Sequence, residues 1–213
     1  MHDLLHDLSL YVGQNDYCLI ENTHGTSNFE KARHVSILDH NLGVDAMRDF
    51  LHKLSNNLRT IIFSCKECTY DEHGCPRLLH FPEGIQRLTA LHRLEFTYCE
   101  SLTSLPRGMK HLTALEILGI WDCEKLILME GDDYPTRLRR LTIGFLPKLV
   151  SLPQGLIPSA STLQFLAIYH CGNLAKLPQW PPNLSSLPKL DILNCPKLLS
   201  LPKKMDRCTV LKD

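Results

Sequence analysis

Cysteine and histidine are the residues of this chain with the most potential for chemistry, and four of them cluster in one short segment. Cys65 and Cys68 are followed closely by His73 and Cys75. Thiolate and imidazole are ligands that tetrahedral zinc prefers. The spacing is nevertheless crowded and irregular for a zinc site, and Cys75 is explained equally well by the repeat pattern described below. The segment is therefore interpreted as an inserted loop around Thr69 to Gly74, and no metal is expected.

Nucleophilic catalysis or nucleotide chemistry would leave other marks in the sequence. The chain has nine cysteines and eleven histidines, but nothing places one beside the other at a glycine elbow or a helix start. Neither of the glycine-rich phosphate-binding motifs, G-x-x-x-x-G-K-S/T and G-x-G-x-x-G, occurs. The sequence therefore predicts a protein that is not an enzyme.

A phrase of the form L-x-x-L-x-L-x-x-C recurs five times, with leucine in the last place of the third copy. Its copies begin 23 to 25 residues apart, at Leu91, Leu115, Leu138, Leu163 and Leu187. A fixed period in this range is typical of a leucine-rich-repeat solenoid, in which each turn adds one strand to a curved parallel sheet. The predicted fold is thus α/β, a solenoid with a concave parallel sheet and a short helical N-terminal segment. The expected strands are Leu91–Thr97, Leu115–Trp121, Leu138–Gly144, Leu163–Tyr169 and Leu187–Leu193.

Side-chain alternation along each strand predicts which residues face the core. In the first copy Leu94 and Phe96 should point inward, and Arg93, Glu95 and Thr97 should point out of the concave face. Four of the five copies, all but the second, are followed by a second half that reads xxLxxLP. Because proline lacks an amide proton and favours extended neighbours, this half should be extended or carry short 3₁₀ turns.

Earlier parts of the chain fit the same plan less closely. Strands are expected at Arg33–Leu38 and at Leu58–Phe63. A helix is expected over Val44–Leu54, because apolar residues recur there at intervals of three and four.

Four cysteines share the last place of the phrase and should be small buried thiols that donate weakly to the loop backbone. They are Cys99, Cys123, Cys171 and Cys195.

The concave face carries one aromatic residue per turn, flanked by charges of both signs. Exposed aromatic and charged side chains together resemble the makeup of binding hot spots. The alternative is that some rings fold over the sheet edge and pack on their neighbours. The candidate partner-binding residues are Arg93, Glu95, Tyr98, Trp121, Asp122, Arg140, Phe145, Tyr169, His170, Lys189 and Asp191.

Composition narrows the class of protein. The 213 residues include 23 basic and 23 acidic side chains, and this balance argues against a dedicated nucleic-acid binder. No apolar run is long enough to span a bilayer, and the first residues do not resemble a signal peptide. Nine cysteines without a secretory signal are typical of reduced thiols, so a cytoplasmic location is expected.

The first nine residues, MHDLLHDLS, predict an amphipathic helix. They also resemble the Met-His-Asp motif and following helix of plant nucleotide-binding leucine-rich-repeat (NLR) immune receptors of the coiled-coil class. The stretch Ala32–Ile37 resembles the opening of the repeat domain in that family, and the cysteine-bearing repeats with their Leu-Pro halves match it as well.

This resemblance implies a division of the chain and a role for its first residues. Residues 1–28 would be the end of a nucleotide-binding module and a linker, and residues 29–213 a leucine-rich-repeat domain truncated at its C-terminus. The resemblance gives contact with the ADP phosphate to His2 and maintenance of the inactive state to Asp3, in a full-length receptor only. No cofactor is expected for this chain, although ADP or ATP is implied for the full-length family member.

The function that the resemblance implies is that of a plant innate immune receptor fragment. Its repeats would recognise a pathogen effector or a guarded host protein, and would contact the nucleotide-binding module of the parent receptor to hold it inactive. The alternative is a stand-alone intracellular leucine-rich-repeat scaffold for protein interactions, with a coincidental resemblance at Met1 to Ser9. A nucleotide-binding module encoded in frame upstream would separate the two hypotheses.

Overall fold

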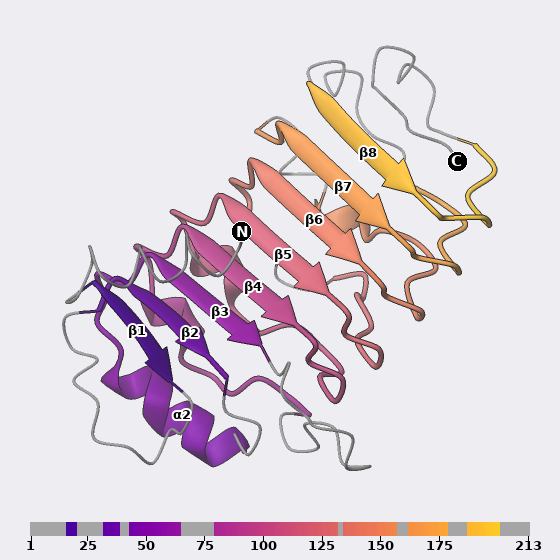
Figure 1. Ribbon diagram of the computed structural model, residues 1–213. Coiled ribbons are helices and arrows are strands. Elements are labelled where there is room, and N and C mark those ends of the chain that lie inside the picture. The colour runs from indigo at the N-terminus through magenta and orange to yellow at the C-terminus, as the bar shows by residue number, and fades with distance from the viewer. Residues whose placement is uncertain are drawn as a thin grey trace, which may run out of the picture.

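One parallel sheet of eight strands organises the described part of the molecule (Figure 1). The computed structural model describes residues 16–20, 32–38, 43–64, 79–131, 134–156, 162–178 and 187–200. The order of the strands across the sheet is their order along the chain. Their bounds are β1 (Tyr17–Ile20), β2 (His34–Ile37), β3 (Thr60–Ser64), β4 (Arg93–Thr97), β5 (Ile117–Trp121), β6 (Arg140–Gly144), β7 (Phe165–Tyr169) and β8 (Lys189–Leu193).

The five strands predicted from the recurring phrase are confirmed, and each begins two residues later than expected. Before each of β4 to β7 the chain bends, and the N–H groups of the residue before the strand and of its first residue anchor it to the preceding repeat. The carbonyl of Arg59, for example, accepts hydrogen bonds from the N–H groups of both His92 and Arg93. Leu91 is fully buried in this bend, so the opening leucine of the phrase belongs to the core although it precedes the ladder.

The strands pair in phase, so that equivalent residues of the phrase stack on one another. Leu94 of β4 pairs in register with Leu118 of β5, and Phe96 pairs with Ile120. The same register continues through β8. The resulting rows of Leu and Ile are at most 6% exposed and form the centre of one continuous core. Burial of each such side chain stabilises the fold by about 1.5–3 kcal/mol.

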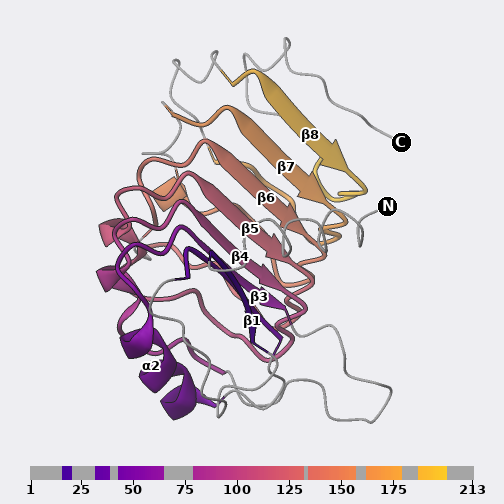
Figure 2. The same ribbon diagram turned by 60° about the vertical axis from the view of Figure 1, so that its left-hand side comes forward.

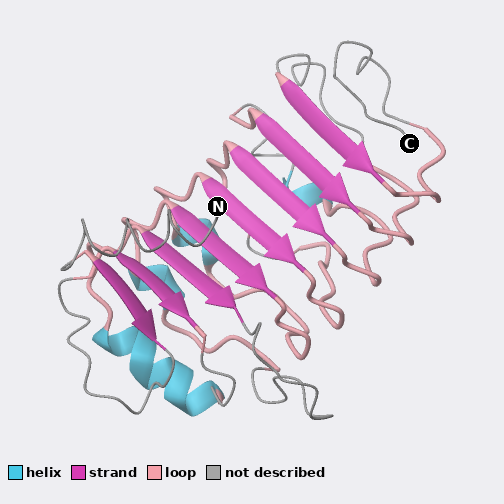
Figure 3. Ribbon diagram, viewed as in Figure 1, coloured by secondary structure: helices cyan, strands magenta, loops and turns pink. Residues whose placement is uncertain are grey.

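Helices and return segments lie on one face of the sheet (Figures 2 and 3). The predicted helix is confirmed as α2 (Val44–Lys53), which buries Met47, Phe50 and Leu51. In the described residues the Leu-Pro halves carry only short 3₁₀ turns, as predicted, at η2 (Ile85–Arg87), at η3 (Met109–His111) and at residues 154–156. We call the opposite face of the sheet, which no described helix covers, the open face.

Strand β1 was not predicted. It lies within residues 1–28, where the sequence analysis expected a module end and a linker, and it pairs in parallel with β2 from Tyr17 to Ile20. Four residues without a leucine phrase give too weak a pattern to indicate a strand. The boundary at residues 28 and 29, the amphipathic helix with His2 and Asp3, the Cys65–Cys75 segment and the C-terminal truncation all lie outside the described residues.

Candidate functional site

The open face is built from the first and third residues of each strand and from the fifth residue of β3 to β8. In β4 these are Arg93, Glu95 and Thr97, which alternate with the buried Leu94 and Phe96. This confirms the inward and outward assignment predicted for the first phrase. Because the strands are in register, outward residues of successive strands form rows across the face.

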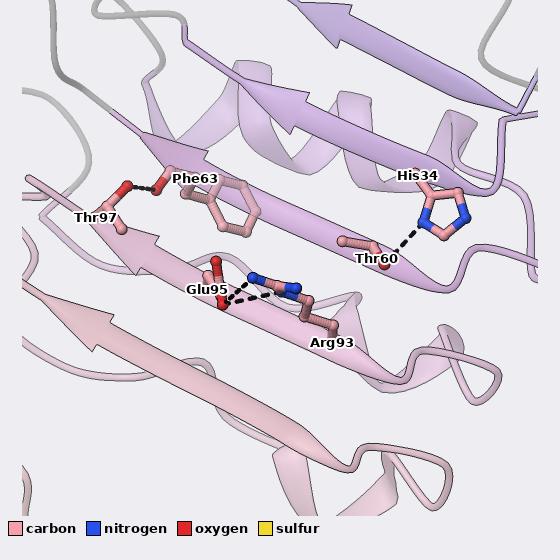
Figure 4. A network of polar contacts seen from close by, with 6 residues as sticks. All are labelled: His34, Thr60, Phe63, Arg93, Glu95 and Thr97. Atoms are coloured by element: carbon pink, nitrogen blue, oxygen red, sulfur yellow. Dashed lines mark hydrogen bonds and ion pairs between the residues drawn. The ribbon is translucent and has the colours of Figure 1, made fainter. Parts of the chain in front are cut away.

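A polar network occupies the open face over β2 to β4 (Figure 4). Arg93 and Glu95 form an ion pair, with 2.8 Å between Nη2 and Oε1, and Nε donates to the same oxygen at 2.9 Å. His34 Nδ1 lies 2.9 Å from Thr60 Oγ1. Desolvation by burial is the main cause that lowers the pKa of His34 below its ordinary value. Arg93 and Glu95 thus satisfy each other in this network.

An aromatic cluster spans β5, β6 and β7. The ring centroid of Trp121 lies 5.3 Å from that of Phe145 and 5.8 Å from that of Tyr169. Phe145 stacks on His170 at 4.4 Å. Trp121 reaches Tyr169 across β6 because Gly144 lies between them, where a Cβ atom would come within 2.5 Å of the indole ring. The four side chains form one contiguous patch, to which we refer below as the aromatic cluster.

The residue after each of the last five strands has a left-handed backbone. These residues have φ between 52° and 57°, and they are Tyr98, Asp122, Phe145, His170 and Asn194. Residues other than glycine adopt this region of backbone conformation rarely, and doing so costs conformational energy. The turn is held by hydrogen bonds to the next strand, such as that from Tyr98 N–H to the Trp121 carbonyl at 2.9 Å.

This turn moves four of the predicted site residues from the face to its edge. Tyr98, Asp122, Phe145 and His170 follow the strands and do not lie within them. The rings of Phe145 and His170 pack on neighbouring rings, and for Phe145 such packing is the arrangement that the sequence analysis weighed against binding. Burial is the main cause that raises the pKa of Asp122, and the nearby Glu124 carboxylate adds to it.

A charged cluster surrounds Phe165 at the start of β7. Arg140 and Lys189 lie over the Phe165 ring, 4.7 and 4.8 Å from its centroid. Lys189 Nζ also lies 3.1 Å from an Asp191 carboxylate oxygen, to which Tyr169 Oη donates at 3.3 Å. Asp191 was expected to be an exposed contact residue. It is only 8% exposed, because Lys189 and Tyr169 fold over it.

A groove with a volume of about 720 Å³ opens beside this cluster, over the starts of β5 to β8. Its charged lining is Glu116, Arg137, Arg139, Arg140 and Lys189, and its other lining residues are Ile117, Thr162, Leu163, Gln164, Phe165 and Pro188. Arg139 and Glu116 pair across its floor, with 3.2 Å between Nε and Oε1.

The repeat cysteines take the role predicted for them. Each thiol lies within hydrogen-bond distance of the carbonyl of the last residue of its strand, as in the 3.4 Å between Cys171 Sγ and the Tyr169 oxygen, and likewise at Cys99, Cys123 and Cys195. The five cysteines within the described ranges are free thiols.

The described residues contain no group of three or more His, Cys, Asp or Glu side chains close enough to hold a metal ion. Over the same ranges, none of the helices has the length and apolar character needed to cross a bilayer.

Sequence reasoning missed several residues of this surface. Phe165 is the first residue of β7, and the repeat pattern indicates aromatic residues only at the ends of the strands and just after them. Arg137 and Arg139 precede β6 and were not assigned to the face. Gly119 and Gly144 were the sequence signal for the packing on this surface. A glycine within a strand often marks a place where another group lies close to the backbone. Glu95 lies against Gly119 as Trp121 lies against Gly144.

No known family model matches the chain, and no curated protein matches it. Its chemistry must therefore be inferred from the surface itself. Rings, paired charges and a cationic groove on one face suit noncovalent recognition of another molecule.

Proposed function

We propose that this chain is the leucine-rich-repeat part of a plant NLR immune receptor of the coiled-coil class. In this role it recognises a pathogen effector or a guarded host protein and restrains the nucleotide-binding module of its receptor. It acts in the cytoplasm, without catalysis and without a cofactor of its own. The support is the resemblance at Met1 to Ser9 and at Ala32–Ile37, together with a leucine phrase that supplies one strand per repeat.

The open face is the observation that carries the recognition role. Its aromatic cluster combines Trp121, Tyr169 and Phe145, the last of which is 38% exposed. Tryptophan, tyrosine and arginine are the residues most enriched at the centres of protein interfaces. Packing among the rings fixes their positions before a partner arrives, which lowers the entropy cost of binding.

The restraining role rests on the resemblance alone. It assigns His2 and Asp3 to the nucleotide contact of the resting receptor, so the repeats act next to a module that senses ADP or ATP. A stand-alone scaffold would share the open face but would have no such neighbour.

The decisive experiment begins with the reading frame upstream of Met1. We expect it to encode a P-loop nucleotide-binding module, and this module, expressed separately in leaf cells, should co-precipitate with the present chain. A frame without a P-loop would instead favour the scaffold.

Recognition is then tested in the full-length receptor. A response to a matching effector should fall by roughly tenfold or more on Trp121→Ala or Tyr169→Ala. Val150→Ala, an apolar truncation at a 60% exposed site outside the strands, should leave it unchanged. Equal responses in all three variants would remove the open face from the binding mechanism.

A further inference from the structure

The groove over the starts of β5 to β8 has a strong local charge imbalance. Four cations, Arg137, Arg139, Arg140 and Lys189, line it together with one carboxylate, Glu116. The whole chain has 23 basic and 23 acidic residues and no net charge. The positive excess is therefore a property of this groove and does not reflect a generally basic protein.

Ion pairs within the molecule neutralise only part of that excess. Arg139 is paired with Glu116, and Lys189 is paired with Asp191. Within the described residues, no ion pair joins Arg137 or Arg140 to a carboxylate. Two guanidinium groups in the groove are thus available to an external anion.

An aromatic ring fixes the positions of two of the cations. Arg140 and Lys189 both lie over Phe165, within 5 Å of its centroid. A cation–π contact orients a cation without neutralising it. Phe165 also joins Ile117 and Leu163 as an apolar part of the lining, so the groove can take a chain that has both apolar and anionic groups.

We propose that this groove binds an extended, acidic segment of a protein partner. The inference rests on the proposed role of the open face in recognition and adds the chemistry of the partner to it. A guanidinium group binds a carboxylate through two parallel hydrogen bonds, a geometry suited to aspartate and glutamate. A volume of about 720 Å³ lies within the range of typical ligand pockets and accommodates a short stretch of peptide.

A protein segment fits better than a nucleic acid. Nucleic-acid binding relies on many phosphate contacts along a basic surface, whereas the four cations described above lie together within one groove. Beyond the groove the open face returns to paired charges at Arg93 and Glu95 and to the aromatic cluster.

The test uses the full chain and a short fluorescent peptide in which glutamate alternates with serine. We expect binding by fluorescence anisotropy that weakens when salt rises from about 0.05 M to about 0.5 M, because the contacts are between partly exposed charges. A peptide with glutamine in place of glutamate should not bind. Hydrogen exchange should show protection at residues 137–140, 162–165 and 187–189.

Two charge-matched double variants locate the site. Arg137→Glu with Arg140→Glu should weaken binding by roughly tenfold or more, equivalent to about 1.4 kcal/mol. Lys125→Glu with Lys148→Glu changes the net charge equally at exposed positions outside the groove and should bind like the unmodified chain. If the first pair disturbs folding by circular dichroism, Arg137→Gln with Arg140→Gln takes its place.

The outcomes separate this inference from the proposed function. Equal weakening by both double variants, or equal binding of the glutamine peptide, would overturn the groove as a specific site. Tighter binding of a single-stranded oligonucleotide of the same charge would assign the groove to nucleic acid and also overturn the proposal. Failure of the upstream frame to encode a P-loop would overturn the receptor role and leave the peptide result standing.

Discussion

At the scale of single residues, the aromatic cluster depends on an absent side chain. Trp121 crosses the backbone of Gly144, and the indole atoms Cε3 and Cζ3 would lie 2.5 Å from any Cβ placed there. A ring held between two strands moves only if its contacts with Phe145 and Tyr169 are given up. Gly144 is thus required for the arrangement of the aromatic cluster as well as for its packing.

We therefore expect Gly144→Ala to lower the free energy of unfolding by about 1–3 kcal/mol, the usual cost of overpacking. Tryptophan fluorescence should shift because Trp121 leaves Tyr169. Gly172→Ala is the matched control, since a Cβ there meets nothing within 4 Å, and it should be close to neutral. Urea denaturation of the two variants measures both effects, and equal midpoints would contradict the packing of Trp121 on Gly144.

A second prediction at this scale concerns two neighbouring thiols. A hydrogen bond from Cys171 lowers the pKa of the Cys195 thiol to about 7 and raises the pKa of Cys171 well above its ordinary value. The thiolate is the form of cysteine that is alkylated. The alkylation rate of Cys195 should therefore rise with pH, with a midpoint near 7. Cys171 should stay unreactive.

The measurement is the rate of iodoacetamide labelling across pH, read at each cysteine by mass spectrometry. Cys171→Ala removes the donor, so the Cys195 midpoint should move to higher pH. An unchanged midpoint in that variant would show that Cys171 does not stabilise the thiolate.

At the scale of the element, the strands were predictable and their termini were not. Leu118 and Ile120 alternate with outward residues as the phrase requires. The bend that delays each strand by two residues comes from hydrogen bonds to the neighbouring repeat, such as those accepted by Arg59. Such contacts are tertiary, so periodicity within one segment does not contain them. The left-handed residue after each strand was missed for the same reason, since Tyr98 and Phe145 carry no glycine-like signal.

The strand register predicts very different losses of stability for substitutions at two neighbouring positions, Leu118 and Glu116. Leu118 is 1% exposed, so Leu118→Asp buries a carboxylate without a partner and should cost more than about 4 kcal/mol. Glu116 precedes β5 with a side chain 41% exposed, and it pairs with Arg139. Loss of such an exposed pair costs about 0–1 kcal/mol, so Glu116→Ala should fold normally.

Soluble yield and thermal melting of Leu118→Asp and Glu116→Ala measure this difference in stability. Comparable melting temperatures would mean that the inward and outward faces of β5 are assigned the wrong way round.

At the scale of the whole molecule, the candidate site was predictable only as a set of residues. The sequence placed Arg140, Lys189 and Tyr169 on one face, and the structure shows them meeting around Phe165 and Asp191. Each outward side chain extends over one or the other neighbouring strand, and this direction decides which side chains contact each other. The space above Gly119 and Gly144 sets this direction for Glu95 and Trp121. The sequence of one repeat does not reveal it, because the glycine and the side chain belong to different repeats.

The isolated chain should show no measurable affinity for ADP or ATP by calorimetry, although it carries His2 and Asp3. One hydrogen bond from a histidine to a charged phosphate contributes about 1.5–3 kcal/mol, whereas micromolar binding requires about 8 kcal/mol. In the proposed full-length receptor, replacement of His2 should instead favour the active state, because the resemblance assigns to His2 a contact made only with ADP bound. Micromolar ADP binding by this chain would contradict its interpretation as the recognition part of a receptor.

The uniform order of the strands also has a mechanical consequence. Each described strand pairs only with the strands before and after it in the sequence, so tension applied to the two ends acts on the strand interfaces in series and can separate them one at a time. Optical tweezers should therefore record a staircase of small extensions in place of a single rupture. Each step should release about 80 Å of chain, since one repeat holds roughly 24 residues at about 3.4 Å each.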